Sequence, residues 1–231
     1  MIEQHFIKFP TTPYLLAPGD FSSREDRILS DIEAHIFFSE HVIIEEKLDG
    51  ANLGISFSPD GIIQLQNRGH NIVEPFVGQW RPLSEWINHN IDKLFNFLLD
   101  RYIIFGEWCY ITHSVYYNSL PDWFIAFDIY DKQNKSFLST KYRNEMVKQM
   151  ALALVPQIYS GHLSRESIDS YIGQSAFGVQ KSEGLYFRIE DTQYLKHRAK
   201  YVRKDFSQSI ETHWTRKAVN KNQLRNYSHY P

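Results

Sequence analysis

Residues 42–52 read VIIEEKLDGAN, in which an apolar run leads into a turn that holds one lysine among acids. The run 42–44 has the branched, apolar composition of a buried strand, and Gly50 marks the turn after it. A lysine becomes a nucleophile only when its surroundings favour the uncharged amine, and a strand end before a tight turn is rigid and partly desolvated. Lys47 is therefore a candidate catalytic lysine. The alternative is a solvated lysine in a polar hairpin, and the tetrapeptide 47–50 alone does not decide between the two.

The composition is that of a folded, soluble protein. The chain has 231 residues, of which 42% are hydrophobic and 15% aromatic, enough to bury a sizeable core. No apolar run approaches the roughly 18 residues of a membrane span, and the N-terminus lacks the layout of a signal peptide. The single cysteine, Cys109, excludes an intrachain disulfide and a cysteine-based zinc site. We therefore expect a soluble, intracellular protein in the cytoplasm.

The charge is unevenly distributed. Residues 181–231 hold eleven Lys and Arg against five acids, although the whole chain has a formal net charge of -2. A basic end beside an acidic body indicates a polyanionic partner, such as a nucleotide or a nucleic acid. An ordinary solvated surface explains the charges equally well, so charge alone leaves both readings open.

Apolar periodicity and turn signals predict an alternation of helices with strands paired in hairpins. We expect helices at 23–38 (with Ser22 or Ser23 as cap), 83–99, 140–152, 164–172 and 206–217. We expect strands at 42–44, 51–57, 62–66, 102–105, 123–130, 185–189 and 194–202. The sequence SPDG at 58–61 is a strong hairpin signal, and residues 220–231 are expected to fray. Clustered hairpins with helices between them predict an α+β fold with mainly antiparallel sheets.

Polar residues stand at the ends of several of these strands. They are Lys47, Arg68 before Gly69, Glu107 after Gly106, and Glu183 before Gly184. The hairpin at 58–61 brings Arg68 back towards the Lys47 end. Charged residues at strand ends are typical of a groove with apolar walls that presents chemistry at its floor.

In this order the residues resemble the motifs of the covalent nucleotidyltransferases, the superfamily of ATP-dependent DNA and RNA ligases and mRNA capping guanylyltransferases. The matching segments are KLDG at 47–50, RG at 68–69, FGE at 105–107, FIAFDI at 124–129, EGLYFR at 183–188 and the basic strand 196–203. The resemblance covers nearly the whole chain. It implies an ATP-grasp-like nucleotidyltransferase domain with two mainly antiparallel sheets flanking a nucleotide groove and helices packed outside.

Within the superfamily the chain is most similar to RNA ligases of the phage nick-sealing type and their bacterial relatives. Asn52 after the lysine motif, FGEW at 105–108 and RAKYVR at 198–203 carry this similarity. DNA ligases usually add an oligonucleotide-binding (OB) barrel after the last motif. Here we expect residues 1–205 to form the nucleotidyltransferase domain and residues 206–231 a short basic helix or tail, with no separate OB domain.

The resemblance implies a reaction in three steps. Lys47 attacks the α-phosphate of ATP, the lysyl-AMP passes AMP to an RNA 5′-phosphate, and a 3′-hydroxyl displaces AMP to seal the strand. Lys47 must be neutral to attack, and a nearby Mg²⁺ or Mn²⁺ ion and the cationic Lys200 favour that form. Carboxylates suit a hard divalent cation, so Glu107 and Glu183 are the expected metal ligands and also candidates for the ribose hydroxyls.

The other roles also rest on the resemblance. Arg68 is expected to reach a phosphate or the ribose, and Phe127 to stack on adenine. Glu46 and Asn52 are expected to read the base and the attached RNA end. Arg198 and Lys200 are expected to bind phosphate, and each of these residues also has an ordinary structural reading as surface charge or core.

Three cations of the basic strand, Lys196, Arg198 and Lys200, recur at period two, so a regular strand would aim all three at one face. Lys200 is our first candidate for the α-phosphate. The chain departs here from the usual Lys-x-Lys of the family, because Val202 stands at the second position with Arg203 beside it. Which of the four cations contacts the α-phosphate stays open at this point.

The sequence thus predicts an ATP-dependent RNA ligase that needs Mg²⁺ or Mn²⁺ and acts on RNA ends, in a nicked duplex or a broken loop. A monomer without membrane attachment is favoured. The alternatives are a DNA-directed ligase, a GTP-using capping-type enzyme, and an inactive module that binds nucleotide or RNA.

Overall fold

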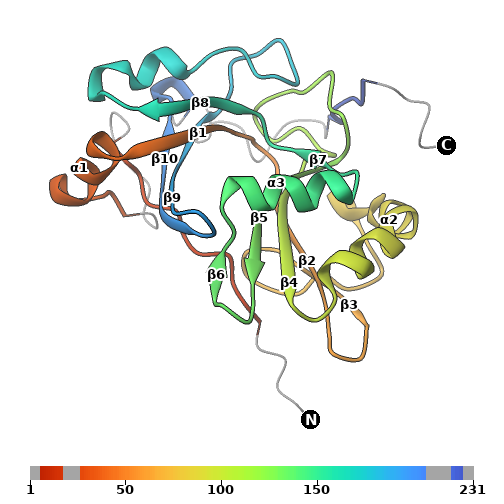
Figure 1. Ribbon diagram of the computed structural model, residues 1–231. Coiled ribbons are helices and arrows are strands. Elements are labelled where there is room, and N and C mark those ends of the chain that lie inside the picture. The colour runs from red at the N-terminus through yellow and green to blue at the C-terminus, as the bar shows by residue number, and fades with distance from the viewer. Residues whose placement is uncertain (1–5, 18–26, 207–219, 226–231) are drawn as a thin grey trace. The chain divides into compact units, whose positions relative to one another are not determined.

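The computed structural model describes residues 6–17, 27–206 and 220–225 (Figure 1). The chain divides into two compact units, and each has its own sheet. The first unit comprises residues 1–10, 50–110 and 122–154, and the second comprises residues 11–49, 111–121 and 155–231. The predicted α+β fold with mainly antiparallel sheets is confirmed.

The first unit is built on a six-stranded sheet with the order β3-β2-β4-β5-β6, and β7 pairs with β5. All pairs are antiparallel except β5 with β7. The strands are β2 (Ala51–Phe57), β3 (Ile63–Gln66), β4 (Tyr102–Trp108), β5 (Phe124–Asp131), β6 (Ser136–Phe137) and β7 (Ala153–Leu154). The SPDG turn joins β2 to β3 in register, which confirms the predicted hairpin.

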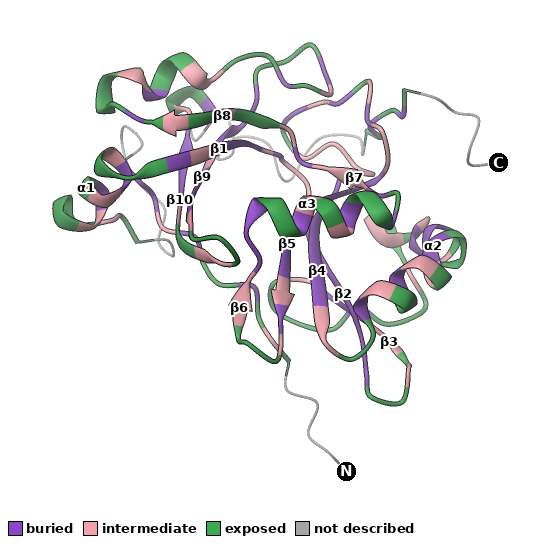
Figure 2. Ribbon diagram, viewed as in Figure 1, coloured by how far each residue is buried: buried purple, intermediate pink, exposed green. Residues whose placement is uncertain are grey.

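Alternation along β4 sends side chains to two different faces of this sheet. On one face Trp108 packs edge-on against Trp86 of α2 (Leu83–Leu98), with ring centroids 6.0 Å apart. The helix α3 (Thr140–Gln149) is anchored to β5 because Arg143 Nη1 donates to the carbonyl of Phe127 at 2.6 Å. The 3₁₀ turn η1 (Gly78–Trp80) precedes α2. In Figure 2 the central strands β2 and β4 are largely buried, whereas α3 shows an exposed outer side.

The second unit has a four-stranded antiparallel sheet with the order β10-β9-β1-β8. Its strands are β1 (His41–Lys47), β8 (Gln157–His162), β9 (Gly184–Glu190) and β10 (Leu195–Val202). One face carries the apolar residues of the core, which pack with α1 (Asp31–Ser39) and the 3₁₀ helix η2 (Arg165–Tyr171). These strand residues are Val42, Ile44, Leu185, Phe187, Ile189, Ala199 and Tyr201. The alternate residues therefore project from the opposite face.

Several boundaries differ from the prediction. Among the described residues the first helix begins at Asp31, because Ser30 caps it: the Ser30 hydroxyl accepts from Glu33 N–H, and the Glu33 carboxylate accepts from Ser30 N–H. Residues 27–30 are not helical, and residues 23–26 of the predicted helix lie outside the described residues. Residues 164–172 form a 3₁₀ helix at Arg165–Tyr171. The strand β8 was not predicted. The helix expected at 206–217 lies, apart from Phe206, outside the described residues.

The expected fraying of residues 220–231 is wrong for residues 220–225, the part of that range that the structure describes. Lys221 and Leu224 form β-bridges with Ile111 and Leu120. Asn222 and Leu224 are buried. This segment is therefore part of the packed second unit.

Gly184 pairs with both neighbouring strands of the candidate site, and there is no room for a side chain at this position. It pairs with Lys47 on one side and Val202 on the other. A Cβ atom at this position would lie 2.0 Å from the carbonyl oxygen of Tyr201. We expect Gly184→Ala to lower the free energy of unfolding by about 3 kcal/mol, at the upper end of the usual cost of overpacking.

Urea unfolding of the two proteins measures this difference. Gly173→Ala is the matched control, since a Cβ atom there meets nothing within 4 Å. Equal loss in both variants would contradict the steric argument.

Candidate active site

The polar face of the second unit's sheet carries the candidate nucleophile. In the β1-β9-β10 register, Lys47 lies opposite Gly184, and Glu45 lies in a row with Tyr186 and Lys200. Lys47 and Lys200 alternate with core residues on their strands, so both project from the face opposite the apolar core. The fold thus brings the lysine motif and the basic strand, far apart in sequence, onto one surface.

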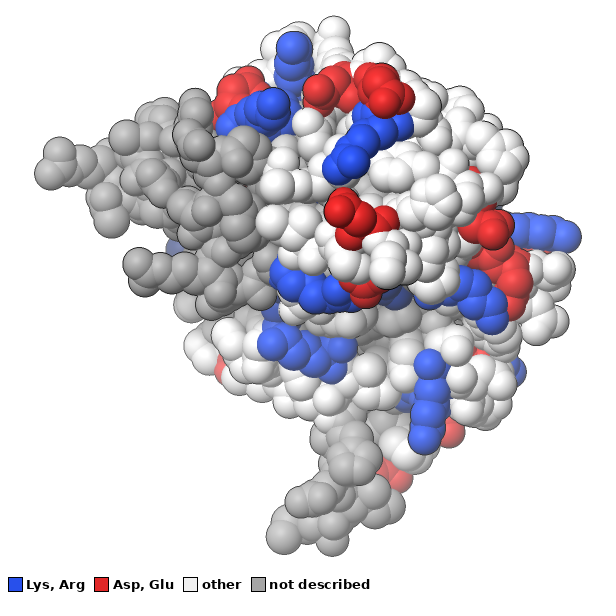
Figure 3. Space-filling view, turned by 90° about the vertical axis from the view of Figure 1, so that its left-hand side faces the viewer, with Lys and Arg blue, Asp and Glu red and all other residues white. Residues whose placement is uncertain are grey.

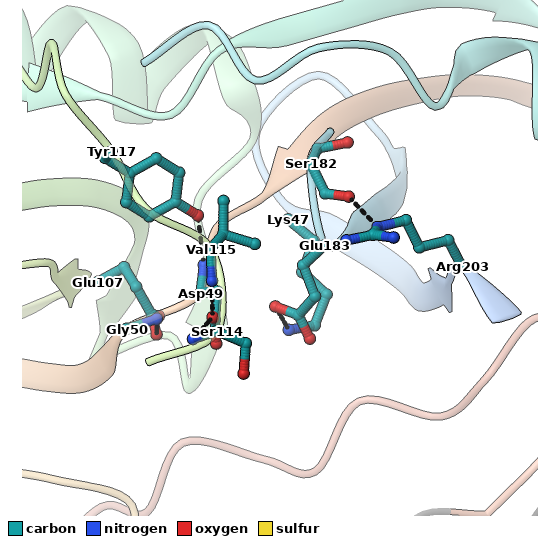
Figure 4. A network of polar contacts seen from close by, with 10 residues as sticks. All are labelled: Lys47, Asp49, Gly50, Glu107, Ser114, Val115, Tyr117, Ser182, Glu183 and Arg203. Atoms are coloured by element: carbon teal, nitrogen blue, oxygen red, sulfur yellow. Dashed lines mark hydrogen bonds and ion pairs between the residues drawn. The ribbon is translucent and has the colours of Figure 1, made fainter. Parts of the chain in front are cut away.

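Lys47 is paired with Glu183, the residue just before β9. Its Nζ lies 2.5 Å from Glu183 Oε2, in a contact that Figure 4 shows directly. Burial raises the pKa of the Glu183 carboxyl, Lys47 opposes that shift, and the nearby Asp49 carboxylate adds to it. The pair therefore holds the amine in place beside a carboxyl group whose charged form is disfavoured, which suits an amine that must give up its proton before it attacks.

Asp49 is fixed by the loop 111–121 (Figure 4). Its Oδ2 accepts hydrogen bonds from Ser114 N–H at 2.6 Å and Val115 N–H at 2.8 Å. Its own N–H donates to the Tyr117 hydroxyl at 2.8 Å. Side chain and backbone of Asp49 are thus both held, two residues beyond Lys47, and the turn between them has little freedom.

Glu46 points to the other side of β1 from Lys47 and is 4% exposed. Its Oε2 accepts from Ala176 N–H at 3.0 Å, whereas Oε1 is buried with no hydrogen-bond donor among the described residues. Burial raises the pKa of this carboxyl above its ordinary value. A buried acceptor next to the nucleophile is consistent with a group that reads a ligand's donor, the role expected from sequence.

The raised pKa of Glu46 predicts a pH-dependent stability. An acid with a higher pKa in the folded chain contributes most below its unfolded pKa of about 4.5, and that contribution is lost as the pH rises through the folded pKa. Glu46→Gln lacks this loss. We therefore expect the free energy of unfolding of Glu46→Gln, relative to that of the parent, to increase between pH 4 and pH 8. Urea titrations at each pH measure this difference.

Glu40→Gln serves as the matched control, because Glu40 is exposed at the end of α1. A Glu46→Gln difference that stays constant with pH would contradict the assignment.

The cations of the basic strand are not equivalent. A register shift between Leu195 and His197 interrupts the alternation, so the predicted common face is wrong for Lys196. Lys196 instead pairs with Asp191 in the β9–β10 turn, at 2.5 Å. Lys200 is 7% exposed, and its Nζ lies 4.3 Å from the centre of the Tyr14 ring.

The Arg203 side chain is occupied by contacts with neighbouring residues of the chain. Its Nε donates to the carbonyl of Ser182 at 2.9 Å, as Figure 4 shows, and its guanidinium pairs with Asp205. Lys200 is placed differently, because its charge opposes part of the rise that burial causes in the pKa of the Glu183 carboxyl. Lys200 therefore acts electrostatically on the Glu183 carboxyl that pairs with Lys47.

Buried charges on the same face were missed from the sequence. Arg188 is fully buried, with its Nε 2.6 Å from Glu190 Oε1 and its Nη1 3.9 Å from Glu45 Oε2. Arg198 lies opposite Arg188 in the sheet register. The available signal was the alternation of charge with apolar residues at 187–189, which places Arg188 on the polar face. Removing one partner of such a buried group is strongly destabilising.

In the first unit, Glu107 and Asn52 are neighbours across β4 and β2. Glu107 Oε1 accepts from Gly50 N–H at 3.0 Å, a bond drawn in Figure 4. A Cβ atom at Gly50 would lie 2.7 Å from the carbonyl oxygen of Trp108, so this position requires glycine. Asn52 is 8% exposed, and its Oδ1 is buried with no donor among the described residues. The first unit thus offers a carboxylate and an unused acceptor on adjacent strands.

Two further candidates belong to the first unit. Phe127 packs edge-on against Phe9, with ring centroids 5.3 Å apart. Arg68 follows β3 and is exposed. The hairpin register places Gln66 opposite Gly54, so Arg68 follows β3 at the end where β2 begins.

The described residues contain no group of three or more His, Cys, Asp and Glu side chains placed to hold a metal ion. Among the same residues, no helix has the length and apolar character needed to cross a membrane.

Basic and acidic side chains are interspersed on the face in Figure 3. In the basic C-terminal part of the chain, for example, Lys196 pairs with Asp191.

A model of the family described as RNA ligase matches residues 40–202. Solved structures of RNA ligase from Naegleria gruberi are also similar. The one with pyrophosphate is 24% identical with a TM-score of 0.60, covering 74% of this chain and 52% of that one. A mutant with ATP and Mn is 22% identical with a TM-score of 0.59, covering 77% and 54%. A mutant without ligand is 18% identical with a TM-score of 0.61, covering 90% and 58%.

These identities show a shared fold. The chain spans between about half and two thirds of the length of the ligases it matches. No curated protein matches the sequence.

Proposed function

The chain belongs to the RNA ligase family, and from that premise we propose that it joins 3′-hydroxyl and 5′-phosphate RNA ends with ATP through a covalent lysyl-AMP intermediate. The observation that carries the proposal is the 2.5 Å pair between Lys47 and Glu183. A nucleophilic lysine needs to be held and needs a route for its proton. The buried carboxyl beside it serves both needs.

The steps follow from the chemistry of the amine. Lys47 Nζ, once deprotonated, forms a bond to the α-phosphorus of ATP while the bond to pyrophosphate breaks. The Lys47–AMP phosphoramidate then passes AMP to an RNA 5′-phosphate, and the free amine of Lys47 is restored. A 3′-hydroxyl attacks that 5′-phosphate, AMP leaves, and a phosphodiester is formed. Such phosphoryl transfer depends mainly on positioning and charge neutralisation.

ATP and a divalent cation fit the donors that are present. Mg²⁺ and Mn²⁺ prefer oxygen ligands, and Mg²⁺ is commonly held by one or two carboxylates together with substrate phosphates. Glu183 and Glu107 would provide those carboxylates, and a bound cation would neutralise charge on the phosphates. The solved Naegleria gruberi ligase with ATP and Mn supports the choice of nucleotide and metal.

The remaining binding roles are proposed as the resemblance implies. Lys200 and Arg198 bind phosphate, with Lys200 on the α-phosphate. Glu46 and Phe127 contact the base, Arg68 a phosphate or the ribose, and Asn52 the RNA end. The buried acceptors of Glu46 and Asn52 support two of these assignments.

We further propose that residues 1–205 act as the nucleotidyltransferase domain of a cytoplasmic monomer, whose substrates are RNA ends in a nicked duplex or a broken loop. The basic residues in the range 196–225 are the proposed RNA contacts. Arg216 and Lys217, which belong to this set, lie outside the described residues.

Incubation with α-labelled ATP tests the proposal, because the label should appear on the protein and a mass spectrum should show one added AMP on the peptide with Lys47. Sealing is then compared on nicked RNA, broken RNA loops and nicked DNA. Label from GTP in place of ATP, or a preference for DNA, would favour the alternative enzymes. ATP binding without release of pyrophosphate would identify an inactive module.

A further inference from the structure

We propose that residues 220–225 hold the nucleophile turn in its reactive geometry, with Asn222 as a positioning residue that acts through the loop 111–121. The inference rests on the proposed function of Lys47 and adds a segment that lies beyond all the family motifs. It also assigns a task to a stretch that sequence reasoning expected to fray.

The first step is the pairing of this segment with the loop 111–121. Thr112 N–H donates to the carbonyl of Asn220 at 2.9 Å, and Gln223 N–H donates to the carbonyl of Tyr117 at 2.8 Å. Leu120 N–H donates to the carbonyl of Gln223 at 2.9 Å. These backbone hydrogen bonds involve residues near both ends of the loop, so the segment is paired with the loop along most of its length.

The second step is the side chain of Asn222, which is 1% exposed. Its Oδ1 accepts from the Thr112 hydroxyl and from Tyr117 N–H, both at 2.9 Å. One oxygen atom therefore ties together two loop residues five positions apart. Because the site is buried, water is a poor substitute for that acceptor.

The third step leads from the loop to Lys47. The residues between the two ties, Ser114 and Val115, donate both of their N–H groups to Asp49 Oδ2, and the Tyr117 hydroxyl accepts from Asp49 N–H (Figure 4). Tyr117 thus bonds Asn222 through its backbone and Asp49 through its side chain. A displacement of the loop must move Asp49 and, two residues away, the amine of Lys47.

The same loop supports the other side of the nucleophile. Tyr116 N–H donates to Gln180 Oε1 at 2.7 Å, and Ser119 N–H donates to the carbonyl of Phe177 at 3.0 Å. The neighbouring Ala176 N–H is the donor to Glu46. The loop 111–121 therefore holds Asp49 directly and also contacts the segment 176–180, whose Ala176 holds Glu46.

Two substitutions at one position test the idea. Asn222→Leu has a similar size and no acceptor, whereas Asn222→Asp keeps an oxygen at the same place. Gln223→Ala is the control, because the Gln223 side chain is exposed and its backbone bonds are unaffected. All measurements are made at a temperature at which melting curves show every variant to be folded.

The first readout is acetylation of Lys47 by acetic anhydride, followed by peptide mass spectrometry over a range of pH. It reports the reactivity of the amine without ATP. The second readout is the single-turnover rate of AMP transfer from ATP. We expect Asn222→Leu to lower the AMP transfer rate by about 10- to 100-fold, the scale for a misplaced reacting group, and to shift the pH dependence of acetylation. We expect Asn222→Asp to return the AMP transfer rate to within about threefold of the parent rate and to return the pH dependence of acetylation to that of the parent. Gln223→Ala should equal the parent in both readouts.

A parent-like acetylation profile and AMP transfer rate in folded Asn222→Leu would overturn the inference, and loss of thermal stability alone would show a merely structural role and overturn it too. If the parent accepts no AMP at all, the proposed function fails. The acetylation profile then still decides whether Asn222 positions Lys47.

Discussion

Replacing Lys47 with arginine is expected to abolish the transfer of AMP from ATP to the protein. Arginine keeps a positive charge opposite Glu183, so the buried carboxyl retains a partner. Its guanidinium stays protonated at any working pH and offers no lone pair for attack. The single-turnover rate should fall by at least about four orders of magnitude, as expected when a covalent nucleophile is removed.

The matched control is Lys181→Arg, the same substitution at an exposed lysine close to Glu183 in sequence. It should take up label at the parent rate. Label on Lys47→Arg at a comparable rate would mean that another group is the nucleophile, and the family motif would then have been assigned to the wrong residue. Label missing from both the parent and Lys181→Arg would instead count against ligase activity.

The parts of the fold that the sequence predicted have strong local signals. The hairpin of β2 and β3 follows from the turn SPDG between two apolar segments, and the two strands pair as the prediction requires. The helix at Leu83–Leu98 follows from the apolar spacing of its buried residues, such as Trp86 and Leu94. Lys47 and Glu183 were both singled out because each stands at the end of an apolar strand, and the structure brings them into contact.

The parts that were not predicted depend on contacts distant in sequence. Strand β8 reads QIYSGH and is largely exposed at the sheet edge, so it lacks the apolar alternation by which a half-buried strand is recognised. Its strand conformation comes from pairing with β1. The register shift before His197, which separates Lys196 from Lys200, arises in the same way from pairing with β9.

The support of Asp49 shows the same limit within the candidate site. Its partners are backbone N–H groups of Ser114 and Val115, which every residue type supplies. Asn222, which ties that loop, stands in a polar stretch without periodicity. Only the folded chain shows that a residue near the C-terminus lies behind the nucleophile turn.

Lys200→Met is expected to lower the rate of AMP transfer to Lys47 by about 100- to 1,000-fold, the usual effect of removing one group that stabilises developing charge. Methionine keeps an apolar side chain against Tyr14 while the ammonium, 4.3 Å from that ring, is lost. The reason for a large effect is burial. Lys200 is 7% exposed, so water screens its charge poorly and replaces it poorly.

Lys196→Met is the matched control, since it makes the same change on the same strand. Lys196 has a half-exposed side chain, is paired with Asp191, and is separated from Lys200 by the register shift. We expect it to leave AMP transfer close to the parent rate and to affect at most the binding of RNA. Single-turnover transfer from α-labelled ATP measures both variants.

The comparison also separates a phosphate contact from a general effect of charge, because the two variants have the same net charge. If Lys200 binds the α-phosphate, the two rates differ by at least about 100-fold, and added salt changes that ratio little because the group is buried. If the strand acts only through its summed charge, both variants slow transfer alike and salt removes the difference from the parent. A loss confined to Lys196→Met would move the α-phosphate contact to the turn end of β10 and contradict the assignment of Lys200.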